Sequence, residues 1–449
     1  MPISVVDTPR EGFLPDWVDP VHESDLIERR RAIHMTPEVG WCEFLSTARA
    51  AEVLSGLGFE VKVGREILQP DYVRGRDPEE AQHAELYAKD QGVPRQLLDR
   101  MEGLTGCVAV FDTKRPGKTI CIRAELDALY VSEPEDPDHL PTRENFHSMR
   151  PGVMHACGHD GHQAVLLELG RFIAANKERL TGKIKFIFQP AEESGGGAAA
   201  IANSGIFEKY GICEIYGGHD EGTRDKGVFG FRVGPAMASV DFFYITVTGQ
   251  GTHGARPHLG HDPVPVAAEI ISALQTLVSR RVDPIEKAVV SVCSVNAGNY
   301  NAPNVIPAVA TMSGTVRTFN EDVRTLISTE LPRIAEGVAE ACGCKAEVTY
   351  EKQTPAVINH PLTTKVLSDY VRKHFGDDAA DENFPISMGG DDFAEYQFKV
   401  PGSIIRVGVR DEAHTFSIHN NRFDFNDEVL AMASTLFAGV ALERLEALA

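Results

Sequence analysis

The fold is indicated most clearly by residues 119–193, which contain TICIRAELD at 119–127, HACGHDGH at 155–162 and KIKFIFQPAEE at 183–193. The apolar TICIRA run predicts a buried strand, and the alternating apolar residues of KIKFIF predict a second strand. Between them, apolar residues recur at helical spacing. A strand, a helix and a strand of these lengths predict an α/β fold with a mostly parallel sheet and helices on its faces.

A different pattern occupies residues 235–354. We expect its elements at 241–248 (strand), 264–281 (helix), 288–296 (strand), 308–319 (strand), 322–341 (helix) and 345–351 (strand). The order β-α-β-β-α-β is the ferredoxin-like arrangement and predicts a self-contained unit. Helix and strand alternation then resumes, with a helix expected at 361–375, a strand at 403–409 and a helix at 426–446. The sequence therefore predicts one α/β domain, made of 1–234 and 355–449, that is interrupted by an inserted domain at 235–354.

Composition excludes several classes of protein. The 449 residues carry 44 Lys and Arg against 65 Asp and Glu, a formal net charge of −21. The electrostatic field of this negative charge repels phosphate backbones and anionic lipid, so we expect neither nucleic acid nor a membrane surface as a partner. No apolar run approaches the ~20 residues of a membrane span. The opening MPISVVDTPREGFLPDW lacks the pattern of a signal peptide, so we expect a cytoplasmic protein.

Four motifs combine polar side chains that can hold a metal ion or move a proton. They are Arg123–Asp127, His155–His162, Gln189–Glu193 and Gly217–Asp220, each expected just past the end of a strand. Open α/β sheets bind ligands outside the carboxyl ends of their strands, so these motifs are expected to converge in one crevice. The segment Ser417–Asn420 adds a further histidine.

The motifs supply a set of metal donors: Cys157, His159, Glu193, His219 and His419. Thiolate, imidazole and carboxylate suit zinc or a neighbouring divalent ion, and five donors exceed a closed tetrahedral site. Five donors are consistent with a second metal ion, or with a single ion that keeps an open coordination position. Taken alone, each motif could consist of ordinary solvent-exposed or core residues. The presence of four such motifs in one domain favours a metal site. Of the adjacent Glu192 and Glu193, one can ligate while the other acts as general base, and Asp127 is a further carboxylate.

The run Gly249–Gly254 matches G-x-G-x-x-G but does not predict a dinucleotide site. That fingerprint requires a helix to open at the glycine turn. Here Pro257 interrupts the start and the helix is expected only from about residue 264. We interpret the glycines as a turn that presents His253.

Longer stretches resemble a known family. MHACGHDGH, FQPAEE, the run at 249–258, NVIP at 304–307, GTVRTF at 314–319 and IHNNRFDF at 418–425 resemble the aminoacylase/carboxypeptidase-type dinuclear metallopeptidases. The nearest part of that family is the amidohydrolase subgroup, which includes p-aminobenzoyl-glutamate, indole-acetyl-amino-acid and hippurate hydrolases. The resemblance extends from RRAIHMTPEVGWCEF at 30–44 to the end of the chain, and the polar insertion at 65–104 looks most like the p-aminobenzoyl-glutamate hydrolase branch.

The resemblance implies a catalytic domain with a ferredoxin-like lid that forms a homodimer or a higher homo-oligomer. It implies that the five donors named above bind one or two divalent ions, Mn²⁺ or Zn²⁺ first and Co²⁺ as a further candidate. It implies Glu192 as general base and Asp127 as the residue that orients a ligand. On the lid it implies residues that reach a small-molecule substrate: His253 at its carbonyl, Asn304 and Arg317 at its carboxylate, and His258.

The sequence departs from the family pattern at three places, which are Glu125-Leu-Asp127, Gly217-Gly-His-Asp-Glu221 and Gly389-Gly-Asp-Asp-Phe393. Asp220 and Glu221 add negative charge beside the expected metal. The predicted reaction is hydrolysis of the C–N bond of a small N-acyl or N-aroyl amino acid. Three alternatives remain open: displacement of an amino group from an electron-poor aromatic acid, a non-catalytic binding protein on the same fold, and a closed structural metal site.

Overall fold

The computed structural model describes residues 23–449, which form two compact units. The first unit contains the described residues up to Gly234 together with 359–385 and 395–449, and the second contains 235–358 and 386–394. The opening segment, on which the expectation of a cytoplasmic protein depends, lies outside the described residues. Between residues 23 and 449, no helix has the length and apolar character needed to cross a membrane.

The first unit alternates helices and strands along most of its length. Its elements are α1 (Glu23–His34), α2 (Phe44–Gly56), β1 (Glu60–Val63), α3 (Pro78–Asp90), α4 (Arg95–Met101), β2 (Cys107–Asp112), β3 (Thr119–Glu125), α5 (Leu140–Arg143), α6 (His159–Ala175), β4 (Lys183–Gln189), α7 (Gly197–Ala202), α8 (Ile206–Tyr210), β5 (Ile212–Asp225), β6 (Phe229–Gly230), α11 (Pro361–Phe375), β15 (Ala380–Asp381), α12 (Ala394–Gln397), β16 (Gly402–Arg410) and α13 (Asp427–Ala447).

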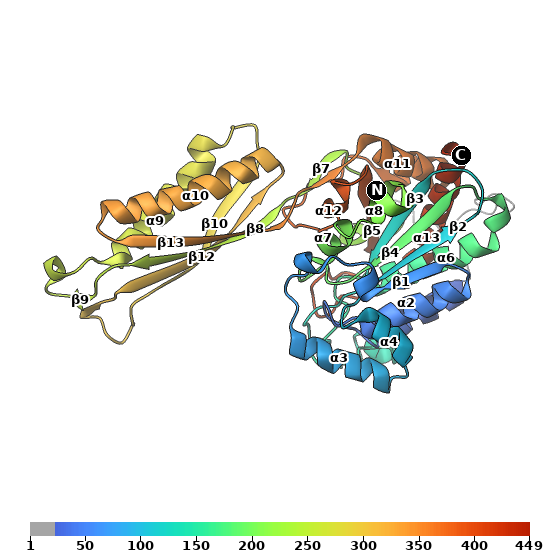
Figure 1. The fold of residues 1–449 in the computed structure, drawn as a ribbon, viewed down its shortest axis with the longest axis horizontal. Coiled ribbons are helices and arrows are strands. Elements are labelled where there is room, and N and C mark those ends of the chain that lie inside the picture. Colours follow the sequence, from blue (N-terminus) through green and yellow to red (C-terminus); the bar gives the residue numbers. More distant parts are fainter. Residues whose placement is uncertain (1–22) are drawn as a thin grey trace. The chain divides into compact units, whose positions relative to one another are not determined.

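An eight-stranded sheet organises this unit, in the order β1-β2-β4-β3-β5-β16-β6-β15. Its centre, β4-β3-β5-β16, is parallel, while β1 and β2 pair in antiparallel fashion at one edge. Helices α1, α6 and α13 pack against one another, and α6 and α13 also contact β3 (Figure 1). The mixed α/β fold with a large, mostly parallel sheet is therefore confirmed.

The apolar patterns of the sequence explain this packing. Every residue of β3 is buried, as expected for a central parallel strand. Helix α6 buries Leu166, Leu169 and Ile173, which recur at helical spacing. The helix starts at His159, directly after Gly158, whose φ of +74° is one that glycine adopts without strain. The start of α6 therefore follows from the HACGHDGH motif itself.

Two motifs lie differently from the expectation that each follows a strand. Strand β5 continues through Asp225, so Gly217–Asp220 lies inside it, and HACGHDGH opens a helix. Strand β5 is long because β16 pairs with it as far as Arg410 opposite Asp225. The expectation holds for Asp127, beyond β3, and for the segment after Gln189, beyond β4.

The second unit has the β-α-β-β-α-β order. Its elements are β8 (Val240–Thr248), α9 (Pro263–Thr276), β10 (Ala288–Ala297), β12 (Val309–Thr318), α10 (Glu321–Ala341) and β13 (Lys345–Thr354). The short strands β9 (Thr252–His253) and β11 (Val305–Ile306) form a separate antiparallel pair. The four long strands form an antiparallel sheet in the order β10-β12-β8-β13, and α9 and α10 cover one face of it (Figure 1). Strands β7 (Gly234–Met237) and β14 (Val357–Asn359) form a separate two-stranded sheet.

A buried ion pair holds α10 on the sheet of the second unit. Arg324 donates to both oxygens of the fully buried Asp241, at 2.5–3.0 Å, and the Tyr350 hydroxyl donates to the same carboxylate at 2.9 Å. Removing one partner of such a pair leaves a buried charge without compensation. We expect Arg324→Met to lower the free energy of unfolding by about 3–5 kcal/mol, measured by urea unfolding followed by circular dichroism.

The matched control for that substitution is on the same helix. Arg333 is exposed and pairs with Glu330 one turn away, so Arg333→Met should cost less than about 1 kcal/mol. Equal effects of the two substitutions would contradict the stabilising role of the buried pair.

Candidate metal centre

The expected metal donors come from four segments of the first unit. Cys157 and His159 lie at the start of α6, Glu193 follows β4, and His219 lies within β5. His419 lies in the connection between β16 and α13. Because β4, β3, β5 and β16 are adjacent in the sheet, segments far apart in sequence meet at one place.

Cys157 is at the centre of the donor cluster. Its Sγ lies 3.4 Å from Nε2 of His219 and 3.3 Å from Nε2 of His419. The same His419 nitrogen lies 3.3 Å from Oε1 of Glu193. The ligand atoms of Cys157, His159 and His219 lie within 4.8 Å of one another, as do those of Cys157, Glu193 and His419. All five donors expected from the sequence are therefore brought together.

The ring orientations of two histidines suit metal binding. His159 donates from Nδ1 to the backbone carbonyl of Asp127 at 2.8 Å, and its buried Nε2 has no hydrogen-bond partner. His219 has the same arrangement, with Nδ1 2.9 Å from the carbonyl of Asp220 and Nε2 toward Cys157. A hydrogen bond at one nitrogen leaves the lone pair of the other for a metal, which is the usual pattern of metal-ligating histidine.

The charges around the cluster also favour a bound cation. Burial raises the pKa of the Cys157 thiol well above its usual range, and the charges of Glu193, Asp220 and Glu192 raise it further. Burial lowers the pKa of His219 well below its usual range, so its imidazole is neutral. A thiol among carboxylates ionises readily only when a positive charge is close. Thiol, neutral imidazole and carboxylate thus fit a divalent transition metal.

The two consecutive glutamates both take part in the cluster. A carboxylate oxygen of Glu192 and one of Glu193 lie within 4.8 Å of a ring nitrogen of His159 and of each other. The backbone N–H of Glu193 donates to Oδ2 of Asp127 at 2.9 Å, so Asp127 contacts both His159 and the glutamate segment. The arrangement can hold an ion and keep one carboxylate for proton transfer.

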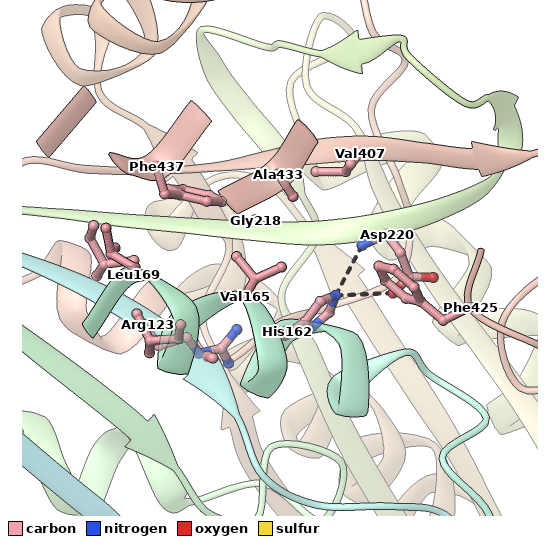
Figure 2. A pocket seen from close by; sticks show the side chains of 13 residues that line it. Arg123, His162, Val165, Leu169, Gly218, Asp220, Val407, Phe425, Ala433 and Phe437 are labelled. Atoms are coloured by element: carbon pink, nitrogen blue, oxygen red, sulfur yellow. Dashed lines mark hydrogen bonds and ion pairs between the residues drawn. The ribbon is translucent and has the colours of Figure 1, made fainter. Parts of the chain in front are cut away.

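His162, in the first turn of α6, lies between Glu125 and Asp220, two residues that depart from the family pattern. Its Nδ1 lies 2.9 Å from Oε2 of Glu125. On the other side of the ring, its Nε2 lies 3.1 Å from Oδ1 of Asp220 (Figure 2). Burial lowers the pKa of His162, but the charges and hydrogen bonds of Glu125 and Asp220 outweigh it and raise the pKa to about 9. His162 and Asp220, together with Phe425, line a cavity of about 30 Å³, which is enough space for a water molecule.

The remaining expected site residues belong to the second unit. His253 and Asn304 lie next to each other because β9 pairs with β11, with the N–H of Gly254 donating to the carbonyl of Asn304 at 2.7 Å. Both side chains are exposed, as is His258 in the short turn Pro257–Leu259. Arg317 lies on β12, half-buried, and burial lowers the pKa of its guanidinium.

Two residues of this region, His162 and Glu43, are not among those expected from the sequence; Oε1 of Glu43 accepts a hydrogen bond from the backbone N–H of Ala191, the residue before Glu192. His162 was visible as the third histidine of HACGHDGH, in the first turns of α6. Glu43 lies in the stretch RRAIHMTPEVGWCEF, which carried the family resemblance without a role for this residue. The identity of their partners depends on contacts that are distant in sequence.

A mostly parallel α/β sheet with a largely buried cluster of thiol, imidazole and carboxylate donors is an arrangement suited to a metal-dependent hydrolase. The family described as Peptidase family M20/M25/M40 matches residues 121–443. Because this match covers well over half of the chain, the chain belongs to the M20 peptidase family and is a hydrolase. The family resemblance stated from the motifs is confirmed.

Relatives with known names are similar over most of their length. Hippurate hydrolase of Campylobacter jejuni is 30% identical over 435 residues, covering 97% of this chain and all of that protein. N-acetylcysteine deacetylase of Bacillus subtilis is 36% identical over 351 residues, 78% of this chain and 88% of that protein. A solved structure from Bacillus subtilis, described as a dinuclear metal-binding peptidase of the M20 family, is 32% identical with a TM-score of 0.72, covering 94% of this chain and 98% of that one.

Proposed function

We propose that this protein hydrolyses the amide C–N bond of a small N-acyl or N-aroyl amino acid. The observation that carries the proposal is the convergence of Glu192 and Glu193 with Cys157, His159 and the other metal donors. The related hippurate hydrolase and N-acetylcysteine deacetylase are named for the removal of an acyl group from an amino acid, which supports the substrate class.

We assign the metal to five ligands: Cys157, His159, Glu193, His219 and His419. One or two divalent ions, Mn²⁺ or Zn²⁺ with Co²⁺ as a further candidate, match these donor types. When bound, such an ion lowers the pKa of water and polarises the substrate carbonyl. Asp127 orients this set through its contacts with His159 and with the backbone of Glu193.

In this proposal Glu192 moves the protons. It accepts a proton from the attacking water and delivers it to the nitrogen that leaves when the C–N bond breaks. The neighbouring Glu193 is then free to act only as a ligand. The two roles account for the presence of two carboxylates beside His159.

The second unit supplies the substrate contacts in this proposal. His253 would donate to the developing oxyanion, an interaction that is strongest in the transition state. Asn304, His258 and Arg317 would hold the substrate, with the Arg317 guanidinium suited to a bidentate pair with a carboxylate. We also propose a homodimer formed through residues 235–354.

We propose a cytoplasmic location for the enzyme. All eight of its cysteines are free thiols, including the buried Cys157. Free thiols persist in a reducing compartment, whereas oxidising compartments favour disulfides.

A metal-reconstitution screen tests the proposed function. Protein stripped with a chelator should regain activity on reloading with Mn²⁺, Zn²⁺ or Co²⁺, and metal content should rise to one or two ions per chain. The panel contains hippurate, N-acetyl amino acids, indole-acetyl-amino acids, p-aminobenzoyl-glutamate and amino-substituted aromatic acids. Metal-dependent release of an amino acid is the expected result.

Other outcomes of the same screen select the alternatives. If the protein takes up metal and releases ammonia from an aromatic amine but cleaves no amide, it is an aminohydrolase and the proposal is wrong. Absence of both metal uptake and turnover would favour a binding protein on the same fold.

A further inference from the structure

One buried carboxylate beside the metal centre has no part in the mechanism above. Glu43 immediately precedes α2, and none of its surface is exposed. Its Oε1 accepts a hydrogen bond from the backbone N–H of Ala191 at 2.7 Å, and its Oε2 accepts one from the Thr105 hydroxyl at 2.5 Å. Ala191 directly precedes Glu192 and Glu193, so Glu43 contacts the turn that carries both functional carboxylates.

The helix that follows Glu43 does not need this side chain for capping. A residue immediately before a helix commonly accepts from the free N–H groups of its first turn. Here Glu38 does so instead, accepting from Leu45 at 3.0 Å and from Ser46 at 2.7 Å. Glu43 makes no side-chain capping bond. Its carboxylate is therefore directed to Ala191 and Thr105.

The turn at Ala191 has an unusual backbone conformation. Its φ of +51° lies in the left-handed region, which costs free energy for any residue except glycine. Consecutive residues of a strand point to opposite faces. Glu192 and Glu193 nevertheless both bring a carboxylate oxygen close to His159. The chain must leave the extended conformation after β4, and Ala191 is one residue at which it does so.

The surroundings of the turn are tightly packed. A side-chain carbon added to Gly40 would lie 3.2 Å from Cα of Ala191, and one added to Gly106 would lie 2.8 Å from Cδ of Pro190. Ala191 itself is fully buried. Its N–H therefore depends on a protein acceptor, because a buried N–H without a partner is costly.

We propose that Glu43 is a positioning residue that holds the left-handed turn at Ala191 and thereby sets the placement of Glu192 and Glu193. This inference rests on the proposed function for the roles of the two glutamates. Asp127 accepts from the N–H of Glu193, so one carboxylate holds the turn before Glu192 and another holds it after. Glu43 acts only through the backbone and touches neither metal nor substrate.

Glu43→Ala tests the proposal. Without the acceptor, the turn at Ala191 should relax and both glutamates should move. We expect kcat on the substrate found in the screen to fall about 10–100-fold, with a smaller change in KM. We expect the affinity of the metal-free protein for Mn²⁺ to fall about 10-fold or more, because Glu193 is on the same turn. Amide hydrogen exchange at Ala191 should accelerate.

Two rescue variants distinguish positioning from general stability. Glu43→Gln keeps an oxygen that accepts from Ala191 and an amide that donates to the Thr105 hydroxyl, so we expect near wild-type Mn²⁺ affinity. Ala191→Gly in the Glu43→Ala background should recover part of the lost affinity, since glycine adopts a positive φ without strain.

Glu38→Ala is the matched control. Glu38 is also fully buried and also accepts two hydrogen bonds, but its partners are at the start of α2. We expect this variant to lower the melting temperature and to leave Mn²⁺ affinity and kcat unchanged. Thr105→Val, which removes only the second partner of Glu43, is a milder variant that should weaken Mn²⁺ affinity a few-fold.

The proposal is overturned if Glu43→Ala binds Mn²⁺ and turns over substrate within about twofold of wild type, or if Glu38→Ala causes the same losses. Wild-type Mn²⁺ affinity of Thr105→Val would also count against it. Failure of the proposed function would be recognised separately. Full activity of a Glu192 variant would show that Glu192 is not the general base. The Mn²⁺ affinity of Glu43→Ala would still test whether Glu43 holds the turn, because Glu193 lies on the same turn.

Discussion

Glu192→Gln is expected to keep the fold and the full metal content and to lose about 10²–10⁴-fold in kcat, the range typical of general acid–base catalysis. That loss corresponds to about 3–5 kcal/mol of transition-state stabilisation. The amide has nearly the size of the carboxylate but cannot accept a proton from water. Steady-state kinetics on metal-reconstituted protein, with metal content measured on the same sample, provide the test.

The neighbouring residue supplies the comparison for this prediction. Glu193→Gln should lose metal as well as activity, because Glu193 lies against His419 and Cys157 in the donor cluster. Near-normal turnover of Glu192→Gln would contradict its role as general base. Equal loss of metal in both variants would show that the two carboxylates share one role.

The second large effect is expected for Cys157→Ser. The thiol is the common neighbour of His219 and His419, and a hydroxyl does not ionise to replace a thiolate ligand. We expect Mn²⁺ or Zn²⁺ affinity to fall by more than about 100-fold, beyond the 10–100-fold typical of residues that only support a ligand. Activity at limiting metal should be lost in parallel. Titration of the metal-free protein measures the affinity directly.

Cys213→Ser is a suitable control for the thiol substitution. Cys213 is also a free thiol of the first unit, and its Sγ donates to the carbonyl of Thr119 at 3.3 Å, which a hydroxyl can also do. We expect unchanged metal affinity and activity. Unchanged metal affinity of Cys157→Ser would remove Cys157 from the ligand set.

Local patterns predicted most of the regular structure. The helix expected at 361–375 is α11, and the strand expected at 403–409 lies within β16. The donor types at the predicted sheet edge were sufficient to select Cys157, His159 and three further residues that meet in the structure. Apolar periodicity and ligand chemistry are both properties of short segments, so a single sequence can reveal them.

Features that depend on long-range backbone pairing were not predictable. The full length of β5 follows from its partner β16, which begins at Gly402. Residues 386–394 join the second unit through backbone hydrogen bonds such as that from Ala238 to Ser387. Backbone groups are the same in every residue, so such pairing leaves little trace in the sequence. The left-handed conformation of Ala191 likewise depends on a contact with Glu43, far away along the chain.

The place of β16 in the sheet also has a consequence for synthesis of the protein on the ribosome. Strand β5 ends at Asp225, but its neighbour β16 emerges only after Gly402, and His419 emerges later still. At ~5–20 residues per second, β5 waits on the order of ten seconds or more with one edge unpaired. The contiguous stretch 235–358 is complete before then. During this interval the unpaired edge of β5 is open to pairing with other chains, and the proposed metal ligand His419 is synthesised only after it.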